Sequence, residues 1–155
     1  MKRNLLILLA SCFVMVAFSQ NDDGIQWVTW EKLEQSLEEQ PKPVLIYFHA
    51  DWCAYCKKLD REVFTNIKVI EKINRDYYAV EMDVETLDTI VFDGVTFVNE
   101  QVKTKRNPIH ELPLLLASRD DEVFSLPATL FFDVNFVIRE RVFNYYTAKQ
   151  LLDRL

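Results

Sequence analysis

Cys53 and Cys56, two cysteines separated by two residues, are the side chains in this sequence best suited to chemistry. A disulfide between them closes so short a loop that it restrains little of the unfolded chain, which weakens the case for a purely structural bridge. The same spacing allows one thiolate at the start of a helix to attack a disulfide, and a second thiol one turn later to resolve the product. A zinc site would need His49 and His110 as further ligands, without a second paired motif, so we expect no metal.

The elements that must hold these cysteines follow from the apolar pattern around them. Val44–Phe48 is a short apolar run rich in β-formers, which predicts a strand buried on both faces of a parallel sheet. Apolar residues from 56 to 70 recur at helical spacing, and Asn66 is expected to cap a second helical segment there. Residues 79–84 predict another strand. Strand, helix and strand over this length predict a βαβ unit.

The rest of the chain predicts short helices and strands around this unit. Thr29 is expected to cap a helix that ends before Pro41, and Asp93-Gly94 between two β-rich runs predicts a hairpin. Further helices are expected over residues 109–117 and from Thr147 to Leu155, and further strands over residues 130–132 and 136–143.

Length and charge limit the classes of function. The 155 residues are half apolar, which is enough for one domain with a substantial core. The 18 basic and 24 acidic residues give a net charge of −6. Because binding to a nucleic-acid backbone needs a basic surface, we expect no nucleic acid among the partners.

The N-terminus has the pattern of a secretory signal. Lys2 and Arg3 precede an apolar stretch over residues 5–18, which is short for a membrane span, and Ala17-Phe18-Ser19 supplies small residues for cleavage. We therefore predict a signal peptide over residues 1–19 and an exported domain over residues 20–155. Two alternatives stay open: an uncleaved membrane anchor, and a lipoprotein in which Leu9-Ala10-Ser11-Cys12 is a lipobox and Cys12 carries the lipid.

The run from Pro43 to Cys53, followed by Ala54-Tyr55-Cys56-Lys57, resembles the thioredoxin-like domains of exported bacterial thiol:disulfide interchange proteins. The resemblance extends over the W-C-x-x-C-K motif, the flanking strands, a proline that opens a hairpin and a final helix. It implies an α/β fold, a three-layer α/β/α sandwich with a mixed sheet. Residues 85–125 are then an inserted hairpin-helix segment before the cis-proline.

The resemblance also implies a role for each residue of the site. Cys53 is expected to be the exposed nucleophile and Cys56 the buried resolving thiol. Pro127 is expected to be the cis-proline opposite the disulfide, with Leu126 offering backbone to a substrate strand. The implied substrate-binding residues are Trp52, Tyr55, Leu126 and Pro127.

One position departs from the family pattern. Thioredoxin has a buried aspartate six residues before the first cysteine, where this chain has Tyr47. Glu81 or Asp83 on the neighbouring strand is a candidate substitute as proton acceptor for the resolving thiol. Lys57 and His49, as well as Glu81, are expected to modulate the thiol pKa values.

The predicted function is that of an exported thiol–disulfide oxidoreductase, a reductase or isomerase without a cofactor. Its expected location is the periplasm or the medium, and its expected form is a monomer. Its expected partners are the thiols and disulfides of other exported proteins and a membrane or periplasmic redox partner. The alternatives are a non-catalytic thioredoxin-like binding module and a lipid-anchored adaptor, each with a structural disulfide. For the insertion, we expect the Asp93-Gly94 hairpin to form a side wall that restricts partners.

Overall fold

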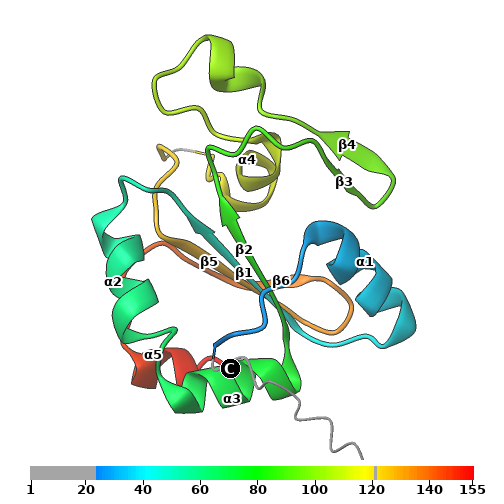
Figure 1. Cartoon of the computed structure of the whole chain (residues 1–155), viewed down its shortest axis with the longest axis vertical. Coiled ribbons are helices and arrows are strands. Elements are labelled where there is room, and N and C mark those ends of the chain that lie inside the picture. The colour runs from blue at the N-terminus through cyan, green and yellow to red at the C-terminus, as the bar shows by residue number, and fades with distance from the viewer. Residues whose placement is uncertain (1–23, 121) are drawn as a thin grey trace, which may run out of the picture.

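A four-stranded mixed sheet forms the centre of the structure (Figure 1). The computed structural model describes residues 24–120 and 122–155. In chain order, the strands of this sheet are β1 (Val44–His49), β2 (Tyr78–Asp83), β5 (Ala128–Phe132) and β6 (Ile138–Val142). Their spatial order is β2-β1-β5-β6, in which β1 and β2 are parallel and the other two pairs are antiparallel. The predicted strands on either side of the C-x-x-C motif are therefore neighbours.

Helices cover both faces of the sheet, which confirms the predicted three-layer sandwich. Alternate residues of β1 point to opposite faces. Leu45 and Tyr47 belong to one buried cluster, and Ile46 and Phe48 belong to the other. The first cluster includes side chains of α2 (Ala54–Glu62), α3 (Ile67–Asp76) and α5 (Ala148–Leu152), and the second includes side chains of α1 (Trp30–Glu39) and α4 (Glu111–Ala117). In the part of the chain that the structure describes, no helix is long and apolar enough to cross a membrane.

The helical run after the cysteines is divided at the residue that the sequence predicts. The Asn66 side chain caps α3 by accepting hydrogen bonds from the backbone N–H groups of Lys68 and Val69, at 3.1 and 3.4 Å. The break lets α3 change direction and run into β2. Thr29 and Thr147 cap α1 and α5 in the same manner, as predicted.

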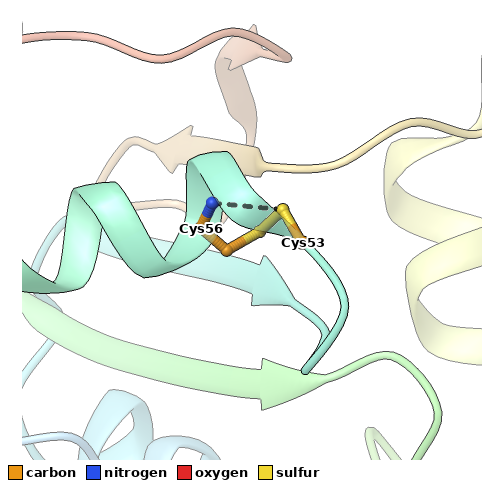
Figure 2. Close-up of a disulfide and its surroundings, with 2 residues drawn as sticks. All are labelled: Cys53 and Cys56. Carbon is orange, nitrogen blue, oxygen red and sulfur yellow. Dashed lines mark hydrogen bonds between the residues drawn. A yellow bond between two sulfur atoms is a disulfide. The ribbon is translucent and has the colours of Figure 1, made fainter.

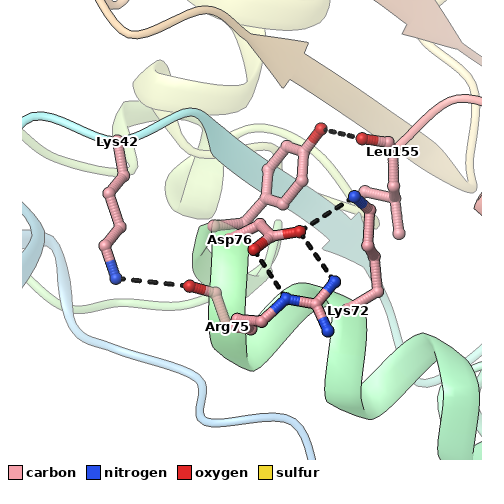
Figure 3. A network of polar contacts seen from close by, with 6 residues as sticks. Lys42, Lys72, Arg75, Asp76 and Leu155 are labelled. Atoms are coloured by element: carbon pink, nitrogen blue, oxygen red, sulfur yellow. Dashed lines mark hydrogen bonds and ion pairs between the residues drawn. The ribbon is translucent and has the colours of Figure 1, made fainter.

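Polar contacts fix the C-terminal end of α3, which leads directly into β2 (Figure 3). The Asp76 carboxylate accepts from Arg75 Nε at 2.9 Å and pairs with Lys72 Nζ at 2.8 Å. These two hydrogen-bonded cations hold the pKa of Asp76 well below its usual range. Close by, Lys42 Nζ donates to the Arg75 carbonyl oxygen at 3.4 Å, and the Tyr77 hydroxyl donates to the Leu155 carbonyl oxygen at 2.6 Å. The contacts join α3, the start of β1 and the last residue of the chain.

Residues 85–125 contain the predicted hairpin and helix. The hairpin strands β3 (Ile90–Phe92) and β4 (Val95–Phe97) pair antiparallel, followed by the 3₁₀ turn η1 (Glu100–Lys103) and α4. The hairpin packs against α1, where the Asp93 backbone N–H donates to Glu34 Oε1 at 2.9 Å and the Phe92 and Trp30 rings meet edge to face. In Figure 1 it therefore lies on the α1 side of the molecule, away from α2.

Several boundaries differ by one to three residues from the sequence-based expectation, and two of these differences have a clear local cause. The last strand begins at Ile138 rather than 136, because the preceding turn is longer than a two-residue turn. The Asp133 carboxylate accepts from the backbone N–H groups of Asn135 and Val137, and Phe136 takes a φ of 58°. The inserted helix begins at Glu111 rather than 109, because His110 is its capping residue.

Candidate active site

Cys53 occupies the N-cap position of α2, after a three-residue turn that follows β1. Its Sγ accepts a hydrogen bond from the backbone N–H of Cys56 at 3.1 Å, and the two sulfurs are joined in a disulfide (Figure 2). Unpaired N–H groups and the helix dipole both favour negative charge at this position. The local fold therefore favours a thiolate at Cys53 when the disulfide is reduced.

The expectation of an exposed Cys53 is wrong for the disulfide form. Cys53 is 4% exposed and Cys56 is 1% exposed. Both sulfurs belong to the buried cluster beneath α2, and Leu126 packs against that cluster. The bond to Cys56 holds the Cys53 sulfur over the first turn of the helix, so Cys53 is only marginally accessible in this state.

The side chains around the disulfide are far more exposed than the cysteines. Trp52 and Tyr55 are 55% and 60% exposed. The Leu126–Pro127 peptide bond is cis, as the resemblance implies. A surface groove of about 1030 Å³ begins beside these residues and is lined by Tyr55, Leu126, Pro127, Arg119, Phe143 and Tyr145. The structure thus brings three of the four expected substrate-binding residues to one groove, while Trp52 lies outside its lining.

Tyr47 lies on the sheet beneath α2, and its hydroxyl is a buried polar group near the site. The side chain is 1% exposed, and its oxygen has no hydrogen-bond partner among residues 24–120 and 122–155. Burial, together with the negative charge of Asp60 on α2, raises the pKa of this hydroxyl above its ordinary range. The residue that replaces the family's buried aspartate is therefore a neutral group at physiological pH.

The structure also shows where the three expected modulators of the thiol pKa values lie, together with Asp83, the second candidate proton acceptor. Glu81 lies directly opposite Tyr47 on β2, where burial raises the pKa of its carboxyl while the charge of His49 acts in the other direction. Asp83 instead caps the end of its strand, because its carboxylate accepts from the backbone N–H of Glu85 at 2.9 Å. The His49 ring is half-buried and stacks on Tyr47, with ring centroids 5.5 Å apart, and Lys57 is exposed.

His110 supports the start of α4 and is not part of a metal site among the described residues. It is fully buried, its Nδ1 accepts from the Leu112 N–H at 3.2 Å, and its Nε2 lies 3.1 Å from the Asp88 carbonyl oxygen. His110 is therefore the N-cap of α4. In the described ranges 24–120 and 122–155, no three His, Cys, Asp or Glu side chains are grouped so that they can hold a metal ion.

Glu85 is a site residue that the sequence analysis missed. One oxygen of its carboxylate, Oε1, accepts from the indole Nε1 of Trp52 at 2.9 Å and from Nδ2 of Asn107 at 3.0 Å. This residue follows β2 at the same end of the sheet where β1 leads into Cys53. Its position after a strand that is parallel to β1 was the available signal, since the ends of parallel neighbours lie side by side.

Comparison with known proteins identifies the family to which this site belongs. The family model for a thioredoxin-like domain matches residues 31–155, which contain every sheet strand, the cysteine pair and the cis-proline. The chain is a member of the thioredoxin-like family. With its C-x-x-C pair, this thioredoxin-like protein belongs at a general level to the thiol–disulfide oxidoreductases.

Its relatives include a protein named for disulfide exchange. The thiol:disulfide interchange protein DsbD of Campylobacter jejuni (strain RM1221) is 26% identical over 126 residues. The match covers 81% of this chain but only 18% of DsbD, so the thioredoxin-like protein corresponds to a small part of that relative.

Solved structures agree on the fold. A thioredoxin from Thermus thermophilus has a TM-score of 0.59 at 16% identity, with 84% of each chain covered. A putative disulphide-isomerase from Bacteroides thetaiotaomicron has a TM-score of 0.55 at 22% identity, covering 85% of this chain and 90% of that one. The predicted thioredoxin-like fold is thereby confirmed.

Proposed function

We propose that the chain is an exported thiol–disulfide oxidoreductase in which Cys53 is the nucleophile and Cys56 the resolving thiol. The observation that carries this assignment is the asymmetry of the pair. Cys53 is the N-cap of α2 and receives the Cys56 N–H, whereas Cys56 lies inside the first turn and is the more deeply buried. The two sulfurs therefore experience different electrostatic environments although they are three residues apart.

The first step needs the reduced pair and a disulfide on the partner. The Cys53 thiolate attacks one sulfur of the partner disulfide, a Cys53–partner bond forms, and the other partner sulfur leaves as a thiolate. The N–H groups at the start of α2 stabilise the thiolate form of Cys53 before attack. The positive end of the helix dipole acts in the same direction.

The second step returns the protein to the state seen in the structure. Cys56 loses its proton and attacks Cys53 Sγ, which re-forms the Cys53–Cys56 disulfide and releases the second partner sulfur as a thiolate. The partner gains two electrons and this chain loses two. A dithiol redox partner must then reduce the disulfide, and run in reverse the same steps oxidise a partner dithiol.

The proposed substrate site is the groove beside Tyr55 and the cis-proline. Leu126 is only partly buried and precedes the cis-proline, and we expect its backbone to pair with an extended partner segment. The groove volume of about 1030 Å³ is large enough for several residues of such a segment. This supports a polypeptide rather than a small metabolite as the substrate.

Export is part of the same proposal. It rests on the signal-like sequence over residues 1–19 and on the alternative lipobox at Cys12, all of which lie outside the described residues. A mature N-terminus at Gln20, read by mass spectrometry of protein from the cell envelope, would support it. An intact Met1 or a lipid-bearing Cys12 would contradict the cleavage that we propose.

The proposed division of labour is tested by trapping partners. We expect Cys56→Ala to accumulate mixed disulfides through Cys53, because the second step is lost while attack remains. Cys53→Ala should accumulate none and should fail to reduce a neutral small disulfide. Non-reducing gels of both variants, after reaction with a disulfide-bonded test protein, measure the adducts directly.

The outcomes separate this proposal from a non-catalytic binding module, a reading that the burial of both sulfurs favours. Equal trapping by both variants would overturn the assignment of nucleophile and resolver. A Cys53–Cys56 disulfide that stays oxidised in millimolar dithiothreitol would instead identify the bridge as structural.

A further inference from the structure

We propose that the loop over residues 99–107, called here the basic loop, is a docking surface for acidic segments of partner proteins. Three cations, Lys103, Lys105 and Arg106, lie within four positions of this loop, and Glu100 is its one acidic residue. The whole chain has a net charge of −6, so the loop is opposite in sign to the chain as a whole. The inference rests on the proposed function, because it names the partners that reach Cys53.

The basic loop lies beside the active-site tryptophan. Glu85 Oε1 accepts from Trp52 Nε1 at 2.9 Å and from Asn107 Nδ2 at 3.0 Å, so one carboxylate oxygen joins the residue before Cys53 to the end of the loop. Arg106 immediately precedes Asn107 in the chain. In Figure 1 the inserted segment projects from the end of the sheet at which β1 and β2 finish and α2 begins.

Internal hydrogen bonds hold the basic loop in one conformation. The Gln101 backbone carbonyl accepts from the N–H groups of Thr104 and Lys105, at 3.0 and 2.9 Å, and its Oε1 accepts from the Ile109 N–H at 3.1 Å. At the other end, Asn99 Nδ2 donates to the Thr86 carbonyl oxygen at 3.1 Å. Because the backbone of the loop is already ordered, binding costs less backbone entropy than it would for a disordered segment.

The charges of the basic loop are available to a partner. Lys103, Lys105 and Arg106 are all exposed, and within residues 24–120 and 122–155 none of them forms an ion pair. By contrast, Arg119 and Arg154 beside the substrate groove are paired with Glu122 and Glu140. Among the described residues, Lys103, Lys105 and Arg106 are thus three unpaired cations within four positions, whereas two of the three arginines that line the groove are in ion pairs.

These features favour an acidic polypeptide segment near the reactive cysteine of the partner. A positive patch on a negative molecule orients an approaching acidic partner, and it repels basic segments. Three cations are too few to hold a nucleic-acid backbone on a protein of this net charge, so a protein segment is the better fit.

The test uses the full chain and three disulfide probes. Two are peptide disulfides of equal length in which the cysteine is flanked by glutamates or by lysines, and the third is neutral hydroxyethyl disulfide. The loop variant carries Lys103→Gln, Lys105→Gln and Arg106→Gln. The matched control carries Lys32→Gln, Lys68→Gln and Arg139→Gln, which remove the same charge from exposed positions on α1, α3 and β6.

At about 0.01 M salt, we expect the wild type to exchange with the acidic peptide about tenfold faster than with the basic peptide. The loop variant should lose this preference and the control variant should keep it. At about 1 M salt the preference should disappear in all proteins. Equal rates for the two peptides in the wild type, or equal losses in both variants, would overturn the inference.

Two further measurements separate this inference from the proposed function. Exchange with hydroxyethyl disulfide should be the same in all three proteins, and no exchange with it in any protein would count against the oxidoreductase itself. Docking is read independently from backbone NMR shifts on adding the acidic peptide with serine in place of cysteine. Shifts confined to residues 99–107 and Trp52, absent in the loop variant, support docking, and unchanged shifts in the wild type refute it.

Discussion

Tyr47 stands where the thioredoxin pattern has a buried aspartate, and Glu81 lies opposite it on the neighbouring strand. The buried hydroxyl of Tyr47 has a raised pKa, so at neutral pH it can donate a hydrogen bond but cannot take up a proton. Glu81, directly opposite on β2, has a carboxyl whose pKa is raised by burial, so it takes up a proton more readily than a fully exposed carboxylate. Of the two groups, only the Glu81 carboxylate can take up a proton at neutral pH, and we propose it as the acceptor for Cys56.

His110 gives the stability of the protein a dependence on pH. Burial lowers the pKa of its imidazole, which is already committed as an acceptor from the Leu112 N–H. Between the lowered folded value and the unfolded value of about 6.5, the unfolded state binds more protons, so stability rises with pH in that range. We expect the free energy of unfolding to be highest above that range and to fall as the pH drops through it, as measured by urea unfolding at several pH values.

The control for this prediction is His110→Asn. Asparagine is a good N-cap that does not titrate, so this variant should lose much of the pH dependence between pH 7.5 and 5.5 while keeping the cap on α4. An unchanged slope in the variant would assign the effect to other groups.

At the scale of elements, the inserted hairpin depends on one glycine. Asp93 and Gly94 have φ values of 52° and 69°, and a Cβ added at Gly94 would meet no heavy atom within 4 Å. The cost of Gly94→Ala is therefore that of the backbone conformation alone, and we expect a loss of about 1 kcal/mol in the free energy of unfolding. Chemical denaturation of the purified variant measures it.

Gly24→Ala is the matched control for the hairpin. Gly24 also has open space around it but no positive φ, so its replacement should change stability by less than about 0.5 kcal/mol. Similar losses in the two variants would mean that the hairpin conformation is not the cause.

The elements that the sequence predicts correctly are those marked by a pattern of neighbouring residues. The hairpin strands on either side of Asp93-Gly94 and the strand that begins at Val44 have the predicted residues almost to the last position. The contact among Trp52, Glu85 and Asn107 is not marked by neighbouring residues in this way, because Glu85 is 33 residues from Trp52 and 22 residues from Asn107. From the sequence alone we expect the hairpin to form the side wall that restricts partners, because the hairpin has a local pattern. In the structure, the inserted segment beside Trp52 is the basic loop.

For the whole molecule, the disulfide is expected to contribute modestly to stability. It joins residues only three positions apart, and the two buried clusters extend over all four sheet strands. In the chain-entropy account, a loop this short is worth about 2 kcal/mol. We therefore expect the reduced protein to remain folded, with a correspondingly smaller free energy of unfolding in urea.

Urea unfolding with and without reductant measures this difference, and a Cys53→Ser/Cys56→Ser variant should show none. Loss of cooperative unfolding on reduction would contradict the prediction and would favour a bridge that holds the fold together.

The hydrogen bond from Trp52 to Glu85 gives the protein a built-in optical probe. Of the three tryptophans in the chain, Trp30 is buried and Trp27 is half-buried, while Trp52 is more than half exposed and stands next to Cys53. Indole emission responds to the partner of its N–H, so any molecule that draws Glu85 or Asn107 away from this contact changes the emission spectrum. We therefore expect the binding of a partner that displaces Glu85 from Trp52 to be detectable by fluorescence in unlabelled protein.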